Sequence, residues 1–241
     1  MRAAVVSDIH ANLAALEAVL AAIGSVDAFW CLGDVVGYGP EPNECIERLQ
    51  ALNALCIVGN HDYAVLGHAS TVDFNADAAA AARWTTDRLD PAARAWLDAC
   101  PQVLRLDPIT LAHGSPYDPI WEYVLSAAVA QRSLRCFETV ACLIGHTHVP
   151  SSFIEQPDGT VDAVYRNEGD VLPVGDQRML ANPGSVGQPR DQDPRAAFLI
   201  YDSDAATLAW RRTPYPIEVT QEKMQLEGLP PRLARRLSFG R

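Results

Sequence analysis

The first 150 residues alternate short apolar segments with longer segments of helical periodicity, and this alternation restricts the possible fold more than any other feature. Such a pattern is typical of βαβ units, in which helices connect parallel strands. The expected strands are 3–7, 28–32, 55–58, 103–106, 109–112 and 140–144. The expected helices are 13–23, 42–52, 74–89, 92–99 and 126–137. This part of the chain therefore predicts a sheet with parallel strands.

The pattern changes after residue 150. Five strand-like segments follow one another with turns and no helical segment between them, at 153–155, 161–165, 179–181, 197–201 and 208–211. This spacing is typical of antiparallel strands. No linker or internal repeat separates the two parts, and 241 residues are enough for one large core. We expect one α/β domain over residues 1–241, with two packed mixed β-sheets flanked by helices, an α/β/β/α sandwich.

The chain is acidic, with a formal net charge of −11. Its last stretch, 228–241, holds four arginines and no acid, which leaves the rest of the chain at −15. This basic tail, with Leu233 and Leu237 at helical spacing, could dock on the acidic body, contact a partner or form a solvated helix. General nucleic-acid and membrane-surface binding require a basic face, so we expect neither.

No apolar segment has the length of a signal-peptide core or a membrane span, so we expect a cytoplasmic protein. The six cysteines show no C-x-x-C spacing, and several lie within apolar segments. Free buried thiols show this distribution, whereas disulfides and thiolate zinc sites do not.

The histidines are concentrated at the ends of expected strands. Five of the six follow directly on a strand, in turns that also contain Gly, Asp or Asn: His10, His61, His113, His146 and His148. A lone histidine is more often structural than a ligand, but that explanation would have to hold five separate times. In an open α/β sheet the loops after successive strands converge on one crevice. We therefore expect a single site.

Seven side chains in these turns are candidate metal ligands: Asp8, His10, Asp34, Asn60, His113, His146 and His148. Carboxylate, imidazole and amide donors without thiolates suit Mn, Fe, Zn and other first-row divalent ions. Seven groups exceed the needs of one ion. They are enough for two ions of four protein ligands each if one carboxylate bridges.

The five blocks 8–10, 33–34, 59–62, 113 and 145–148 resemble the ordered signature D-x-H, G-D, G-N-H-D/E, H and G-H-x-H of the calcineurin-like metallophosphoesterases. Segments 33–39 and 182–185 are similar to the small bacterial phosphodiesterase branch of that family. The resemblance implies a pair of sheets flanked by helices. It also implies two divalent metal ions per chain, with Mn favoured over Fe, Zn, Ni or Mg.

The resemblance assigns roles residue by residue. One metal would take Asp8, His10, Asp34 and His148, and the other Asp34, Asn60, His113 and His146, with Asp34 bridging. His61 would be the catalytic general acid, or a donor to the charged transition state. Asn60 and His61 would also contact the substrate. The implied reaction is hydrolysis of a small phosphate ester by in-line attack of a metal-bridging hydroxide.

The second block departs from one branch of the family. Protein Ser/Thr phosphatases read G-D-x-x-D-R-G, whereas this chain has Gly37, Tyr38 and Gly39 there. We therefore expect a phosphodiesterase before a protein phosphatase. Symmetric hydrolysis of dinucleoside polyphosphates is an alternative, and a non-catalytic scaffold of the same fold is another. The group that orients His61 is left open, since the adjacent Asp62 could point away.

Further side chains are candidates for contact with a small phosphoester or nucleotide substrate. Tyr38 could stack on a base or merely fill space, and Trp121 and Tyr123 invite the same interpretation. Arg190 could bind a phosphate that is not cleaved, or form a surface ion pair. A homo-oligomer is possible, and the sequence does not define it.

Overall fold

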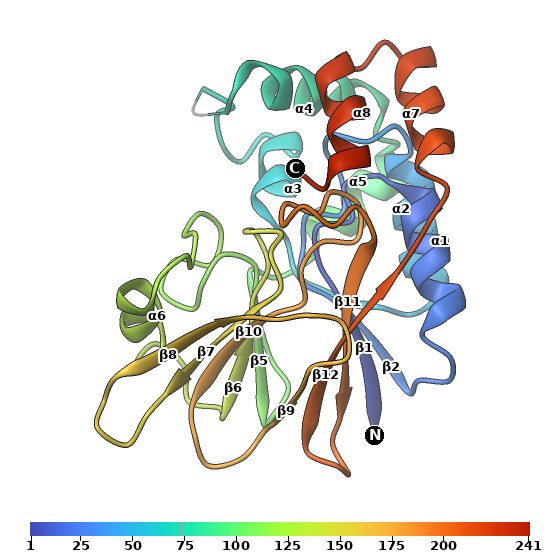
Figure 1. Cartoon of the computed structure of the whole chain (residues 1–241). Coiled ribbons are helices and arrows are strands. Elements are labelled where there is room, and N and C mark those ends of the chain that lie inside the picture. Colours follow the sequence, from blue (N-terminus) through green and yellow to red (C-terminus); the bar gives the residue numbers. More distant parts are fainter. Residues whose placement is uncertain (73) are drawn as a thin grey trace.

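The computed structural model describes residues 1–72 and 74–241, and its strands form two six-stranded sheets (Figure 1). The order of the first sheet is β3-β2-β1-β11-β12-β9. Its strands are β1 (Arg2–Val6), β2 (Ala28–Cys31), β3 (Leu55–Cys56), β9 (Val171–Pro173), β11 (Ala196–Asp202) and β12 (Thr207–Thr213). β1, β2 and β3 pair in parallel, whereas β11, β12 and β9 add antiparallel strands on the other side of β1.

The order of the second sheet is β4-β5-β6-β10-β7-β8. Its strands are β4 (Val103–Arg105), β5 (Ile109–Ala112), β6 (Ala141–Leu143), β7 (Ser151–Glu155), β8 (Val161–Tyr165) and β10 (Met179–Asn182). The expectation of antiparallel strands after residue 150 is correct for β7, β8, β11 and β12. For β10 it is correct on one side only, since β10 pairs antiparallel with β7 and in parallel with β6.

The helices are α1 (Leu13–Ala22), α2 (Pro42–Ala51), α3 (Asn60–Val65), α4 (Ala76–Arg88), α5 (Pro91–Asp98), α6 (Ala127–Ser133), α7 (Ile217–Leu226), α8 (Pro231–Arg236) and the short 3₁₀ helix η1 (Leu237–Phe239). α6 starts where Ser126 accepts a hydrogen bond from the Val129 N–H, as expected for an N-cap. It ends at Ser133 and not at residue 137, as the helical pattern had predicted. None of the described helices has the length and apolar character needed to cross a membrane.

The main core lies between the two sheets. Its buried side chains come from the inner faces of both, and they include Val5, Trp30, Ile57, Leu111 and Leu143. A second core packs the outer face of the first sheet against α1 and α2, and a third packs the second sheet against the region of α6. These layers confirm the α/β/β/α sandwich (Figure 1). Because both sheets share the main core, we propose that the chain is a single domain.

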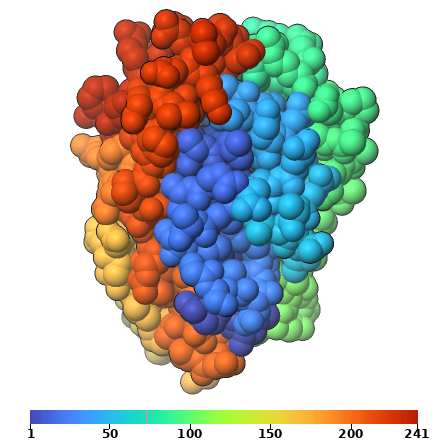
Figure 2. All heavy atoms as spheres, turned by 90° about the vertical axis from the view of Figure 1, so that its right-hand side faces the viewer, coloured from blue at the N-terminus to red at the C-terminus, as the bar shows by residue number. Residues whose placement is uncertain are grey.

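The C-terminal segment caps one end of the molecule, as the side view shows in red (Figure 2). Leu233 and Leu237 are buried in a small cluster with Tyr38 and Ala81. Of the three possibilities for the basic tail, the structure therefore shows docking on the body.

Candidate metal centre

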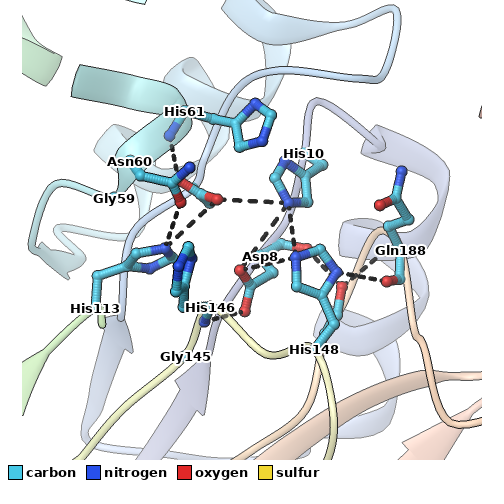
Figure 3. Close-up of polar contacts among 12 residues, drawn as sticks. Asp8, His10, Gly59, Asn60, His61, His113, Gly145, His146, His148 and Gln188 are labelled. Atoms are coloured by element: carbon cyan, nitrogen blue, oxygen red, sulfur yellow. Dashed lines mark hydrogen bonds and ion pairs between the residues drawn. The ribbon is translucent and has the colours of Figure 1, made fainter. Parts of the chain in front are cut away.

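The parallel strands of both sheets carry seven polar side chains to one buried centre at their carboxyl ends (Figure 3). Asp8 and His10 follow β1, Asp34 follows β2, Asn60 starts α3 after β3, His113 follows β5, and His146 and His148 follow β6. None of the seven is more than 5% exposed. The carboxyl ends of parallel strands in one sheet share an edge, and here the two packed sheets place their edges together.

The ligand atoms fall into two groups that share one carboxylate. Those of Asp8, His10, Asp34 and His148 lie within 4.8 Å of one another, and so do those of Asp34, His113 and His146. In the first group the Nε2 atoms of His10 and His148 are 3.2 Å apart. Asp34 Oδ2 lies 3.6 Å from His10 Nε2 and 3.5 Å from His113 Nε2. Asn60 reaches the second group through its Oδ1, 3.1 Å from His113 Nε2.

Two buried carboxylate oxygens in this centre lack a partner. Asp8 Oδ1 and Asp34 Oδ2 accept no hydrogen bond within the described residues, and both carboxylates are about fully buried. Burying a charged oxygen without a partner costs free energy, so these two oxygens favour the binding of a cation. The donor set of carboxylate oxygens and imidazole nitrogens fits a first-row divalent ion.

Backbone carbonyls fix the orientation of all four histidines. In each ring one nitrogen lies within hydrogen-bond distance of a carbonyl oxygen, and the other is left for the centre. The pairs are His10 Nδ1 with Val36, His113 Nδ1 with Leu32, His148 Nδ1 with Gln188, and His146 Nε2 with Trp121. Contacts of this kind select the tautomer and hold the ring of a metal-binding histidine in place.

The backbone at the centre adopts an uncommon conformation. The φ angles of Asp8, His10, Asp34, His146 and His148 are 54°, 50°, 53°, 67° and 61°. Few non-glycine residues occupy this left-handed region, and where they do the surrounding contacts must enforce it. Here loop-to-loop hydrogen bonds do so, for example from Asp8 N to Gly33 O and from His10 N to Asp34 O, at 3.0 and 2.9 Å. Strain of this kind concentrates at functional sites.

Asp62, the residue after His61, is not the group that orients the His61 ring. Its carboxylate accepts hydrogen bonds from the N–H groups of Val35, Val36 and Gly59, at 3.2, 3.0 and 3.0 Å. Asp62 therefore points away from the His61 ring and joins the loop after β2 to the start of α3. Sequence reasoning did not find this role, because the carboxylate acts on backbone groups that carry no sequence signal.

His61 is held by packing and by its backbone. Its N–H donates to Asp34 Oδ1 at 2.8 Å, while its ring Nδ1 is buried without a hydrogen-bond partner among the described residues. The ring centroid lies 4.3 Å from that of Tyr38, 4.7 Å from Phe74 and 5.0 Å from His10. Burial lowers the pKa of His61 to about 4. The ring is thus neutral at neutral pH, and no carboxylate among the described residues forms a hydrogen bond with it.

Burial and charge set the protonation of the centre without metal. Burial lowers the pKa values of His10 and His148 well below 6.5, and that of His146 to about 3. Burial opposes a charge on His113 too, but the carboxylates of Asp34 and Asp8 raise its pKa to about 10. Three of the rings are therefore neutral and ready to bind a cation, while His113 keeps a proton as the counter-charge of Asp34.

Tyr38 is buried and packs against a histidine of the centre. Its side chain is 6% exposed, its φ is 60°, and its ring centroid lies 4.7 Å from that of His10. The ring packs against the rings of His10 and His61, so its burial agrees with the packing alternative. Contact of Tyr38 with a substrate stays a prediction.

Among the described residues Arg190 forms no ion pair with a carboxylate, the alternative that the sequence left open. Its Nη2 donates to Gln188 Oε1 at 2.9 Å, and its guanidinium carbon lies 6.0 Å from the Tyr38 ring centroid. The nearby acids Asp191 and Asp193 pair instead with Arg212. Arg190 thus keeps a guanidinium beside the centre, and its Nε is buried without a partner within the described chain.

The turn after β10 supports the centre through side-chain hydrogen bonds to the backbone of the ligand loops. Asn182 Nδ2 donates to Gly145 O at 2.6 Å, and Ser185 Oγ donates to Asp8 O at 2.8 Å. A Cβ at Gly184 would meet Pro150 and Ala197, so this glycine allows close packing of the turn.

Tyr123 also belongs to the site: its ring stacks on that of His146, with centroids 3.7 Å apart.

Comparisons with known proteins agree with this geometry. The model of the calcineurin-like phosphoesterase superfamily domain matches residues 1–206. An uncharacterized protein of Methanocaldococcus jannaschii is 38% identical over 99% of this chain and 98% of its own length. The crystal structure of a metallophosphoesterase from Sphaerobacter thermophilus is similar over 100% of both chains, with 43% identity and a TM-score of 0.92. A hypothetical protein from Pyrococcus horikoshii has the same fold, with 22% identity, 100% and 98% coverage and a TM-score of 0.82.

Proposed function

Because the chain belongs to the calcineurin-like phosphoesterase superfamily, a family of metal-dependent phosphoester hydrolases, we propose that it is a phosphodiesterase with two divalent ions per chain. The observation that carries this proposal is the pair of ligand groups that share Asp34. A shared carboxylate is the arrangement by which two ions are held close together. Mn²⁺ is the ion we favour, because the donors are nitrogen and oxygen.

The ligand assignment of the proposal uses all seven candidate ligands. Asp8, His10, Asp34 and His148 would hold one ion, and Asp34, Asn60, His113 and His146 the other. Bound ions at this place would neutralise charge on a phosphoryl group and make a water molecule more acidic. The protein supplies the rest: four imidazole rings oriented by backbone carbonyls and two buried carboxylates.

His61 is the residue that we assign to the leaving group. It lies beside His10 and outside both ligand groups (Figure 3). A neutral imidazole with a free ring nitrogen can donate a hydrogen bond or, once protonated, a proton to the departing oxygen. Asn60 would contact a phosphoryl oxygen with its amide N–H₂. The Tyr38 ring keeps both histidines in position.

A diester is favoured over a phosphoprotein because the second block lacks the Asp-Arg pair of the protein phosphatases. The four buried free thiols suit the reducing cytoplasm, which we propose as the compartment. Whether the chain forms homo-oligomers stays a prediction.

The test is turnover by protein reconstituted with Mn²⁺. We expect hydrolysis of bis(p-nitrophenyl) phosphate at least about tenfold faster than that of p-nitrophenyl phosphate or a phosphopeptide, in terms of kcat/KM. A reversed order would contradict the diesterase proposal. Full metal content without turnover of any ester would instead indicate the scaffold alternative. Release of two nucleoside polyphosphates of equal length from a dinucleoside tetraphosphate would indicate symmetric hydrolysis.

A further inference from the structure

An open groove of about 780 Å³ lies between the start of α4 and the C-terminal segment. Residues 75–77 form one wall, and the other wall carries Arg232, Arg235, Arg236 and Arg241. Asp77 is the single acid among the lining residues. The groove is thus strongly basic, although the chain as a whole has a net charge of −11.

The four guanidinium groups form few polar contacts with the rest of the described chain. None of them forms an ion pair with a carboxylate within residues 1–72 and 74–241, where the arginine ion pairs use other residues such as Arg88 and Arg212. The described polar contact of this group joins Arg236 Nε to the carbonyl of Arg241. Unpaired guanidinium groups that converge on a cavity are typical of phosphate and carboxylate sites.

Tyr38 and Arg190 do not line the groove, but both contact the metal centre, and Tyr38 also packs against the C-terminal segment that forms one wall of the groove. Tyr38 packs with Leu233 and Leu237 of the C-terminal segment on one side and with His10 on the other. The N–H of Arg190 donates to the carbonyl of His148 at 3.3 Å. The Arg190 guanidinium carbon lies 6.0 Å from the centroid of the same Tyr38 ring that packs against Leu233 and Leu237, and burial together with the Arg190 charge lowers the pKa of Arg236.

The segment that carries these arginines is fixed in place. Gln192 N–H, two residues after Arg190, donates to the carbonyl of Gly240 at 2.9 Å. Gln221 Nε2 donates to the carbonyl of Ala234 and to Ser238 Oγ, both at 2.9 Å. The cluster is therefore presented by an ordered segment, which reduces the entropy lost when an anion binds.

We propose that Arg190, Arg232 and Arg236 bind a second phosphoryl group of the substrate while the first lies at the metal centre. This inference rests on the proposed function, and it names the substrate class as phosphate esters that carry at least two phosphoryl groups. An extended nucleic acid is a poorer occupant, because long polyanions need a basic surface beyond one groove and the rest of the chain is acidic.

Calorimetric titration of the Mn²⁺-loaded protein tests the proposal directly, independently of turnover. The probes are adenosine 5′-monophosphate and two compounds with a second phosphate, adenosine 3′,5′-bisphosphate and hexane-1,6-diol bisphosphate, which contain no anhydride and chelate metal weakly. We expect at least one bisphosphate to bind about tenfold or more tightly than the monophosphate, a difference of about 1.4 kcal/mol. Arg236→Gln and Arg232→Gln should each reduce this preference to about threefold or less.

The matched control is Arg135→Gln, which removes an exposed guanidinium next to α6, outside the groove. It should keep the full preference, and melting curves should show all three variants folded. Equal binding of all probes to the unchanged protein, or a preference that survives both groove variants, would overturn the inference. Tighter binding of a single-stranded decanucleotide than of either bisphosphate would overturn it in favour of a nucleic acid. Because binding is measured without turnover, inactivity toward diesters would count against the proposed function alone.

Discussion

Asp34 uses its two carboxylate oxygens differently. Oδ1 accepts the His61 N–H at 2.8 Å, while Oδ2, which has no hydrogen-bond partner in the described part of the chain, faces the histidines of both ligand groups. Asp34→Asn removes the charge and one of the two acceptors, so we expect loss of at least one metal per chain and of activity. Elemental analysis after dialysis measures the metal. Asp87→Asn, an exposed carboxylate on α4, is the control. A full metal complement in the Asp34 variant would refute the bridging role.

His61 tests a different part of the same site. Its ring belongs to neither ligand group, so His61→Ala should keep both metals. The loss of a proton donor to the leaving oxygen should lower kcat by about 10²-fold or more. The matched substitution His68→Ala removes an exposed histidine paired with Asp98 and should leave kcat within about twofold. An unchanged kcat in the His61 variant would remove the assignment as acid.

The candidate ligands could be located from sequence because each lies in a short turn directly after a strand, such as Gly-Asp at 33–34. The backbone conformation of these residues could not be predicted from the sequence. The left-handed backbone of His146 and His148 is enforced by contacts with segments distant in sequence, such as the Gln188 carbonyl that holds the His148 ring. For the same reason Asp62 could be marked as adjacent to His61 but not as the acceptor of three backbone N–H groups.

At the scale of secondary structure, elements with a clear apolar pattern were predicted, including the short edge strands β3 and β4, whereas α3, β9 and α7 were missed. α3 has six residues, too few for a periodic pattern to emerge. β9 is an edge strand of three residues that ends in a proline and pairs with β12 alone. α7 buries little beyond Thr220 and Met224, so its sequence lacks a clear apolar face. Their formation depends on tertiary contacts, which local sequence does not record.

α8 offers a test of how firmly the C-terminal segment is docked. Leu233 is 2% exposed, within the cluster that also contains Tyr38. Leu233→Ala should lower the free energy of unfolding by about 2–4 kcal/mol because it leaves a cavity beneath the helix. Leu226→Ala is the control, since Leu226 is 85% exposed and its loss should cost less than about 0.5 kcal/mol. Urea denaturation followed by circular dichroism compares them. Equal midpoints would mean that the tail contributes nothing to stability.

In the molecule as a whole, the two sheets supply different halves of the centre. Asp8, His10 and Asp34 follow strands of the first sheet, and His113, His146 and His148 follow strands of the second. A cation bound between them therefore joins the sheets as well as completing the site. Because such an ion binds the folded chain and not the unfolded one, metal and stability are linked.

This linkage has a definite pH dependence. Without metal, the folded pKa of His113 is about 10, above its ordinary value of 6.5, since Asp34 and Asp8 outweigh burial. The stabilising charge on His113 is fully present below about pH 6.5 and is lost as the pH rises through the folded pKa, so the metal-free protein should become less stable between these values. A cation that binds His113 must displace its proton, so metal affinity should rise over the same range.

At about pH 8 we therefore expect uptake of Mn²⁺ to release at least about one proton per chain, from His113, to which ionisation of a metal-bound water adds; the pKa of Asp8, raised to about 7 by burial, leaves that carboxyl mostly ionised. Calorimetric titration in two buffers with different enthalpies of ionisation counts the protons, and melting in chelator at increasing pH follows the stability. The His10, His146 and His148 rings contribute none, because burial keeps them neutral. Metal uptake without proton release would show that His113 is already neutral, and that the buried Asp34 charge is balanced in another way.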